Sequence, residues 1–152
     1  MEITKTTVRN ATPEDTASLV AFQQAMARET EGKTLHLEPL RRGINAVFHS
    51  PDKGLYLVAE AEGVVIGGLL ITYEWSDWRN AYFWWIQSVY VAPTARRRGV
   101  YRALHQFVVD AARSSGACGV RLYVEKQNRG AQSTYETLGM HETHYRMLEV
   151  EF

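Results

Sequence analysis

Apolar side chains recur at helical spacing in three segments of the chain, which are residues 13–28, 37–48 and 100–114. Thr12 precedes a proline and two acidic residues, a pattern typical of a helix start, and Gly32 is expected to end the first helix. The second helix should stop at the turn Ser50–Asp52. A shorter helix is predicted to begin at the cap Asn128 and to end at Gly139.

Runs of apolar and β-branched residues between these helices predict β-strands. The predicted strands cover residues 3–9, 55–60, 64–73, 82–91, 120–124 and 147–152. Glu62 and Gly63 fit a tight hairpin turn, and Pro93 closes the fourth strand. This order of elements predicts a mixed α/β (α+β) fold, in which an antiparallel meander precedes a βαβ unit. Because no repeat or linker interrupts it, the chain is expected to form a single domain over residues 1–152.

The composition excludes several classes of protein. Hydrophobic residues make up 45% of the 152 residues and charged residues 22%, which is typical of a globular domain. Lysine plus arginine equals aspartate plus glutamate at 17 each, so no net charge favours nucleic acid or a membrane surface. No apolar run reaches the roughly 20 residues of a membrane-spanning helix, and residues 1–20 lack a signal-peptide pattern. Since Cys118 is the single cysteine, we expect a cytoplasmic protein without disulfides.

The segment Val89–Tyr101 is the most informative part of the sequence. It places an apolar strand, a proline, the basic turn Arg96–Arg98 and an amphipathic helix in direct succession. The first N–H groups of a helix have no partner inside that helix, and the helix dipole is positive at this end. Gly99 lets the backbone approach a ligand, and the arginines add charged donors. The pattern therefore predicts an anion site suited to phosphate.

This segment resembles the acetyl-CoA motif of the GNAT superfamily of N-acetyltransferases, Gln/Arg-x-x-Gly-x-Gly/Ala. Arg96 matches the first position and Gly99 the central glycine, whereas Tyr101 stands where glycine or alanine is usual. A second segment, residues 128–140, is similar to the family pattern Asn-x-x-Ala-x-x-x-Tyr-x-x-x-Gly-Phe, with methionine replacing the phenylalanine. The asparagine and tyrosine of this segment are seven residues apart, so they share one helix face.

The resemblance implies a GNAT-like fold, with a central, mostly antiparallel sheet, a splayed pair of parallel strands and flanking helices. It also implies acetyl-CoA as cosubstrate, with pantetheine bonded to the backbone of the fourth strand and the diphosphate on the amides of the basic turn. The cofactor-binding residues that it implies are Val89, Tyr90, Val91, Arg96, Arg97, Arg98, Gly99, Val100, Tyr101, Arg102, Asn128 and Tyr135.

The activity implied by the resemblance is direct transfer of the acetyl group to a primary amine of a small molecule, peptide or protein. Tyr135 is the expected acid for the leaving thiolate, because tyrosine has an ordinary pKa of about 10. Gln87 is the second expected catalytic residue; it stands where many family members carry a glutamate, and it can position water but cannot act as a base. The base stays open, with five candidates: Glu29, Glu31 and Glu74, and more weakly Tyr123 and His105.

Aromatic residues are concentrated around one predicted hairpin. Alternation places Phe83, Trp85 and Gln87 on one face of the strand and Tyr82 and Trp84 on the other. Part of this group belongs to the core. The rest fits either an amine-binding pocket, where aromatic faces attract ammonium groups, or a homodimer interface.

Other ligands and functions are weighed against this interpretation. No metal is expected, because His141 and His144 lack evident carboxylate or thiolate partners, and Cys118 is expected in the core. A non-catalytic acyl-CoA-binding sensor or regulator stays open because of Gln87. Nucleic-acid binding through the arginines would require a wider basic face than the sequence offers.

Overall fold

A computed structural model describes residues 5–152 of the chain. Its elements, in chain order, are β1 (Thr7–Asn10), η1 (Pro13–Asp15), α1 (Thr16–Glu31), α2 (Leu37–His49), β2 (Leu55–Ala61), β3 (Val64–Ser76), β4 (Ala81–Val91), η2 (Pro93–Ala95), α3 (Val100–Ser114), β5 (Gly119–Arg121) and α4 (Arg129–Thr137). The chain divides into a larger unit that ends at Leu122 and a smaller unit, Tyr123–Phe152. The single domain expected over residues 1–152 stays a prediction.

The larger unit contains one five-stranded sheet in the order β1-β2-β3-β4-β5. The first four strands pair antiparallel with their neighbours, whereas β4 and β5 are parallel. Glu62 and Gly63 both have left-handed φ angles, as a tight hairpin turn between β2 and β3 requires. The sheet confirms the predicted mixed α/β fold, with a mostly antiparallel sheet and one parallel strand pair.

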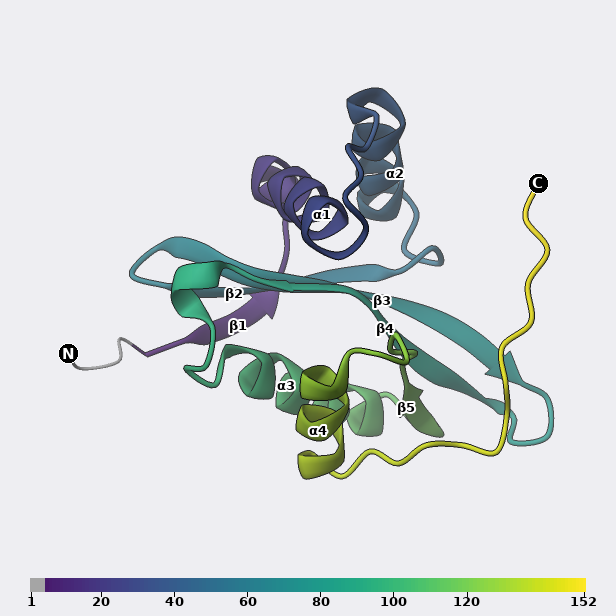
Figure 1. Ribbon diagram of the computed structural model, residues 1–152. Helices are drawn as coiled ribbons and strands as arrows, with labels where there is room; N and C mark the ends of the chain where they lie inside the picture. The colour runs from purple at the N-terminus through teal and green to yellow at the C-terminus, as the bar shows by residue number, and fades with distance from the viewer. Residues whose placement is uncertain (1–4) are drawn as a thin grey trace. The chain divides into compact units, whose positions relative to one another are not determined.

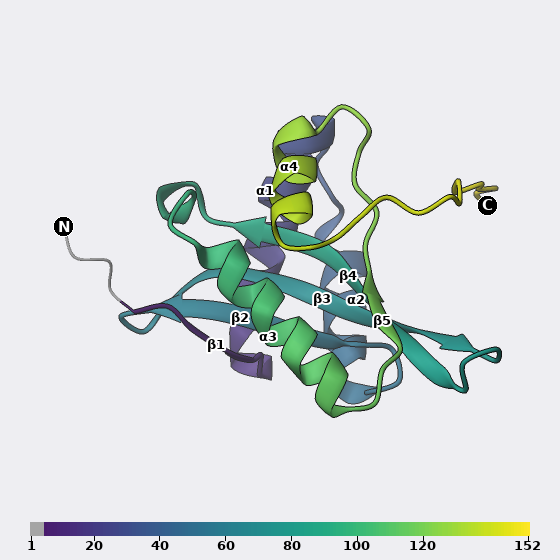
Figure 2. The ribbon, with the colours of Figure 1, turned by 90° about the horizontal axis from the view of Figure 1, so that it is seen from below.

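Helices cover both faces of this sheet (Figure 1). On one face, α1 and α2 pack with alternate residues of β2 in a core of five buried residues: Leu19, Val20, Ile44, Tyr56 and Val58. On the other face, α3 runs across the strands (Figure 2) over a second core of nine buried residues: Leu57, Ala59, Leu69, Ile71, Ile86, Ala95, Val100, Leu104 and Val108. Because side chains alternate along each strand, the sheet contributes residues to two cores, one on each face.

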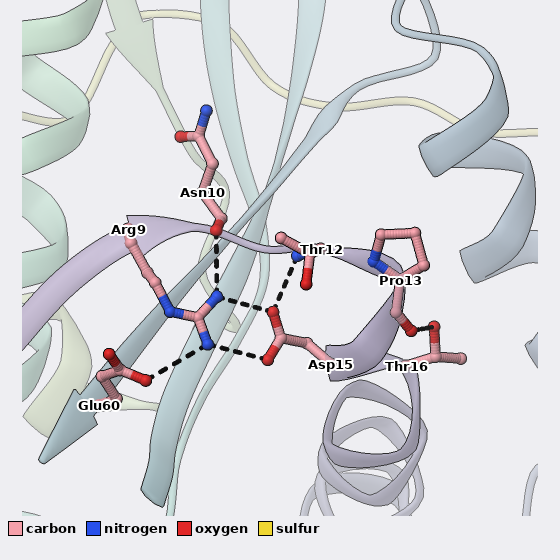
Figure 3. A network of polar contacts seen from close by, with 7 residues as sticks. All are labelled: Arg9, Asn10, Thr12, Pro13, Asp15, Thr16 and Glu60. Carbon is pink, nitrogen blue, oxygen red and sulfur yellow. Dashed lines mark hydrogen bonds and ion pairs between the residues drawn. The ribbon is translucent and has the colours of Figure 1, made fainter. Parts of the chain in front are cut away.

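A polar network joins β1, η1 and β2 (Figure 3). The Arg9 guanidinium donates to both oxygens of Asp15, at 2.8 and 3.0 Å, and to Glu60 at 3.3 Å. The Asp15 carboxylate also accepts the backbone N–H of Thr12 at 2.8 Å. The Arg9 side chain holds the pKa of Asp15 below its ordinary value, against the opposing effect of burial. This buried carboxylate fixes the corner where the first strand turns into the first helix.

Most predicted elements are confirmed, and three strands need correction. The first strand was predicted over residues 3–9 and is β1, while positions 3 and 4 lie outside the described residues. The fifth was predicted over 120–124, but only Gly119–Arg121 forms β5. The predicted strand over 147–152 is wrong, because no residue of this segment is in a strand. Its alternating pattern suits one buried face, yet a strand also needs a neighbour for its backbone groups.

Candidate active site

The passage from β4 to α3 has the backbone geometry of an anion site. After η2, the turn 96–99 contains two residues with left-handed φ angles, Arg97 at 62° and Gly99 at 80°. Glycine adopts such an angle without the steric cost that a Cβ would bring. The first helical hydrogen bond of α3 runs from the Ala103 N–H to the Gly99 carbonyl, at 3.0 Å. The N–H groups from Val100 to Arg102 come before this bond, in the first turn of the helix. This helix end offers N–H donors and a positive dipole to an anion.

The Arg96 side chain is used within the protein itself. Its Nε donates to the Val91 carbonyl at 2.9 Å, and its Nη2 forms an ion pair with Glu29 Oε2 at 2.8 Å. The guanidinium also lies over the Tyr90 ring, 5.3 Å from the centroid. Arg97 and Arg98 are exposed. Of the three arginines, Arg96 therefore fixes the turn, and the other two present their charge to solvent.

Glu29 connects the end of α1 to this turn and to β4. Besides the Arg96 ion pair, it accepts a hydrogen bond from the Tyr90 hydroxyl at 3.3 Å. Burial, together with the nearby Glu29 charge, raises the pKa of Tyr90. The Tyr90 ring also packs on Phe22 of α1, with 5.3 Å between ring centroids. Glu29, a candidate base, is thus held between a cation and a hydroxyl.

A β-bulge lies at Ser88 in β4. Gly68 pairs with Tyr90 and Leu70 with Gln87, so two residues of β4 stand opposite Leu69 alone. Ser88 has a left-handed φ of 52°. The extra residue changes the phase of the strand: Ile86 and Val89 both pack with the α3 core, while Tyr90 faces α1. The bulge re-aims the backbone of the segment predicted to hold pantetheine.

The parallel pairing of β4 and β5 is short. It covers Phe83–Trp85 opposite Gly119–Arg121, while β4 continues to Val91. Within residues 5–152, the rest of β4 has no β5 partner on that edge, which agrees with the splayed pair that the resemblance implied. Backbone groups at such an edge can bond to an amide-containing chain.

Two polar side chains next to this edge are held by cross-strand contacts. Gln87 Nε2 donates to Thr72 Oγ1 at 2.5 Å, which leaves the Gln87 Oε1 as an acceptor. Glu74 Oε1 accepts from the Trp85 indole at 2.8 Å and from Arg121 at 3.1 Å. Thr72 and Glu74 are alternate residues of β3, and Thr72 contacts Gln87 of β4, so Glu74, another candidate base, shares a sheet face with Gln87.

The aromatic residues follow the predicted alternation. Tyr73 packs edge-on against Trp84, and Trp75 against Tyr82, with 5.6 and 4.9 Å between centroids. Phe83 lies on the opposite face of β4, under the Arg121 guanidinium at 3.5 Å. The predicted division of β4 into two aromatic faces is confirmed.

The second segment of the resemblance lies in the smaller unit. Asn128 caps α4 as predicted, because its Oδ1 accepts the Ala131 N–H at 3.2 Å. This bond leaves the Nδ2 amide of Asn128 as a donor. Tyr135, two turns along α4, is partly buried, and burial raises the pKa of its hydroxyl.

Two further candidate bases, His105 and Glu31, and the single cysteine lie in the following surroundings. His105 is buried in α3, where burial lowers its pKa, and Tyr101 Oη lies 3.3 Å from its Nδ1. Glu31 is exposed, and its Oε2 forms an ion pair with Lys33 Nζ at 3.7 Å. Cys118 is partly buried rather than a core residue. No group of three potential metal ligands occurs among residues 5–152. No helix within that range is both long and apolar enough to cross a bilayer.

Two residues that matter for the geometry were missed by sequence reasoning. Ser88 forms the bulge although serine gives no sequence signal for a left-handed angle. Gly67 pairs with Val91, and a Cβ there would lie 3.0 Å from the Tyr90 carbonyl and 3.3 Å from Val100. The absence of a side chain lets β3 approach the strand and the start of α3 closely. The pair Gly67-Gly68 within an apolar run was the available signal.

Known proteins are similar to this chain in sequence and fold. The family model of the acetyltransferase (GNAT) family matches residues 19–140. Mycothiol acetyltransferase of Beutenbergia cavernae is 32% identical over 126 residues, which cover 83% of this chain. The chain spans 41% of the length of that relative.

Solved structures of acetyltransferases have a similar fold. A possible acetyltransferase from Clostridium difficile 630 superposes with a TM-score of 0.90 and 40% identity, over 97% of each chain. A predicted acetyltransferase with acetyl-CoA from Clostridium acetobutylicum shares the fold, with a TM-score of 0.77 and 19% identity over 97% of this chain and 96% of that one. The match over most of the sequence and the shared fold lead to one conclusion: this chain belongs to the GNAT family of acetyltransferases.

Proposed function

We propose that this chain transfers the acetyl group of acetyl-CoA directly to a primary amine of a small molecule, peptide or protein. The observation that carries the proposal is the passage from β4 to α3, where a left-handed turn delivers N–H donors at a helix start. Members of the GNAT family use acetyl-CoA, and a diphosphate is the anion of that cosubstrate that such a helix end would bind.

The cofactor would bind along the remaining predicted residues. Arg97 and Arg98 are exposed and can add charge beside the diphosphate. The β4 backbone over Val89–Val91, beyond the bulge, would bond to the amides of pantetheine. Asn128 would donate its free Nδ2 to a pantetheine carbonyl, since its Oδ1 is used in the cap. Arg96 supports this site from within, by holding the turn.

Transfer requires a neutral amine and a leaving thiol. A primary amine with a pKa near 10.4 is mostly protonated at neutral pH, so one proton must leave before attack. The attack forms a C–N bond and an oxyanion, which a backbone N–H of β4 would stabilise. Collapse of this intermediate breaks the C–S bond, and Tyr135 would protonate the thiolate. Because burial raises the pKa of Tyr135, its hydroxyl keeps its proton at neutral pH.

The proton of the ammonium group would leave through a water molecule at the sheet face that carries Gln87. The Gln87 Oε1 can accept a hydrogen bond from the ammonium group or from a water molecule that removes its proton. Glu74 shares this face, although Trp85 and Arg121 already donate to one of its oxygens. Glu29 binds Arg96 and Tyr90, which favours a supporting role over proton abstraction.

A second candidate function is an acyl-CoA-binding sensor without turnover. It is favoured by Gln87 in the place of a usual glutamate and by the contacts that occupy Glu29 and Glu74. Both functions require cofactor binding, so only turnover separates them.

The cytoplasmic location of the protein remains a prediction.

A thiol-release assay with acetyl-CoA and a panel of primary amines tests the proposal. We expect CoA release that depends on the amine and a product heavier than the amine by one acetyl group in mass spectrometry. The sensor would bind acetyl-CoA in calorimetry with no amine-dependent release. Release without any acetylated amine would also contradict the proposed transfer.

A further inference from the structure

The first turn of α3 carries a tyrosine where the resembling motif usually has glycine or alanine. Tyr101 is the second residue of the helix, so its N–H is among the donors proposed to bind the diphosphate. Side chains of a helix tilt toward its N-terminus, and a ring at this position can therefore cover those donors. The direction in which the Tyr101 ring points thus decides whether a diphosphate can reach them.

His105 contacts the end of the Tyr101 side chain. The Tyr101 hydroxyl oxygen lies 3.3 Å from His105 Nδ1, and the two ring centroids are 5.7 Å apart in an edge-on arrangement. The residues are four positions apart on α3, so they share one face of the helix. Because His105 lies one turn further from the helix start, the contact holds the ring along the side of α3 and away from its first N–H groups.

His105 can fix the ring because it is itself fixed. Its exposed fraction is 4%, and it follows Leu104, a fully buried residue of the core under α3. Burial lowers the pKa of His105, so the imidazole is neutral at neutral pH. A neutral imidazole has one donor and one acceptor nitrogen, and a tyrosine hydroxyl can donate or accept, so the pair can bond in either tautomer.

We propose that Tyr101 and His105 form a positioning pair, in which the histidine holds the tyrosine ring off the first N–H groups of α3 and keeps them accessible to the diphosphate of acetyl-CoA. The inference rests on the proposed function, because it concerns binding of the cosubstrate at that site. It gives His105, a candidate base, a role in cofactor binding instead. A ring released from His105 would cover the donors for part of the time. The apparent Kd then equals the intrinsic Kd divided by the fraction of molecules in which the donors stay open.

Calorimetry with CoA and with pantetheine tests the pair, because only CoA carries the diphosphate. Tyr101→Phe removes the hydroxyl, and His105→Leu removes the imidazole while keeping a side chain of similar size. Each variant should raise the Kd for CoA about fivefold, the factor that one net hydrogen bond contributes, and should leave the Kd for pantetheine unchanged. The double variant should bind CoA no more weakly than either single variant, because both changes break the same contact.

Two further variants separate positioning from a general effect on the helix. His105→Asn keeps a polar atom at the place of Nδ1 and should retain most of the wild-type affinity for CoA. Gln106→Met is the matched control, because it removes another contact between side chains four residues apart on α3, the exposed Gln106–Asp110 hydrogen bond of 2.9 Å. The Kd of this control for CoA should not change. Circular dichroism on each variant establishes that the fold is kept.

The Tyr101→Ala background decides whether His105 acts through the ring. No ring is left to release in this background, so the addition of His105→Leu should not change the Kd for CoA. A fivefold loss that persists there would overturn the inference, and so would full affinity of both single variants or an equal loss for pantetheine.

Thiol release from acetyl-CoA, measured on the same chains with the amine panel, distinguishes failure of the inference from failure of the proposed function. A wild type that binds CoA without turnover contradicts the proposed transfer alone. Turnover by a wild type whose variants bind CoA as tightly contradicts the positioning pair alone.

Discussion

Arg96 stands at the first position of the segment that resembles the acetyl-CoA motif, yet its half-exposed side chain contacts other residues of the protein. It binds the Val91 carbonyl and Glu29, and it covers Tyr90. The arginine at this motif position is therefore explained by its structural role: it holds the turn in which Arg97 and Gly99 adopt left-handed conformations. We therefore propose that Glu29 is a positioning residue, which acts on the proposed cofactor site through this arginine.

Replacement of Glu29 should weaken cofactor binding modestly. Glu29→Gln removes the charge that holds Arg96, and a half-exposed ion pair is worth up to about 1 kcal/mol. We expect the Kd for acetyl-CoA, measured by calorimetry, to rise about two- to fivefold. Glu31→Gln is the matched control on the same helix, because Glu31 pairs with Lys33 in solvent rather than with Arg96; the Kd of this variant for acetyl-CoA should not change. Equal effects of the two variants would contradict the positioning role.

Replacement of Tyr135 should affect turnover and leave binding intact. Tyr135→Phe removes the proposed acid while keeping the ring, so kcat should fall about 100-fold with an unchanged Kd for acetyl-CoA. Since burial raises the pKa of this tyrosine above its ordinary value of about 10, the wild-type kcat should show no loss from its deprotonation below pH 10. A variant with full kcat would rule out Tyr135 as the acid.

Element boundaries show where sequence reasoning succeeds and where it fails. The helix α3 follows from its apolar stripe and from the glycine before it, and Asn128 gave the start of α4. The Ser88 bulge could not be predicted, because it depends on how β4 is matched to β3 rather than on its own residues. The strand over 147–152 was predicted from its own apolar residues, which say nothing about the neighbour that a strand requires.

The Arg9–Asp15 contact predicts a pH-dependent stability at the corner between β1 and α1. Asp15→Asn should lower the free energy of unfolding by about 1–3 kcal/mol at pH 7, since the carboxylate is buried and binds a guanidinium. The folded state lowers the pKa of Asp15, so its contribution is present above the unfolded value of about 3.9 and is lost as pH falls through the folded value.

Thermal denaturation at several pH values checks this contribution. The difference in Tm between wild type and Asp15→Asn should be largest at neutral pH and should shrink below about pH 4. Glu38→Gln is the control, because its ion pair with Arg42 is exposed and should contribute little. A difference that grows on acidification would contradict the assignment.

At the scale of the whole molecule, the order of elements was sufficient to predict the fold. One helix pair and one single helix cover opposite faces of a mostly antiparallel sheet (Figure 1), where the sequence predicted flanking helices without assigning them to a face. The order of elements could not predict the acceptor, because an acceptor contacts side chains that differ among members of one fold.

Cofactor binding should stabilise the folded chain, and the diphosphate should account for much of the effect. CoA at about 100 times its Kd should add about 2.7 kcal/mol, a rise in Tm of several degrees. Pantetheine, which lacks the diphosphate, should give a much smaller rise at the same concentration. Equal shifts for both compounds would show that the β4–α3 turn does not bind the diphosphate.

A titration of the ¹⁵N-labelled chain with CoA, followed by the backbone amide signals, tests the central claim most directly. The account predicts that the largest shifts occur at residues 97–102, with a second group at Val89–Val91. Saturation with unchanged amide signals over 97–102, or with the largest shifts on α2, would contradict it.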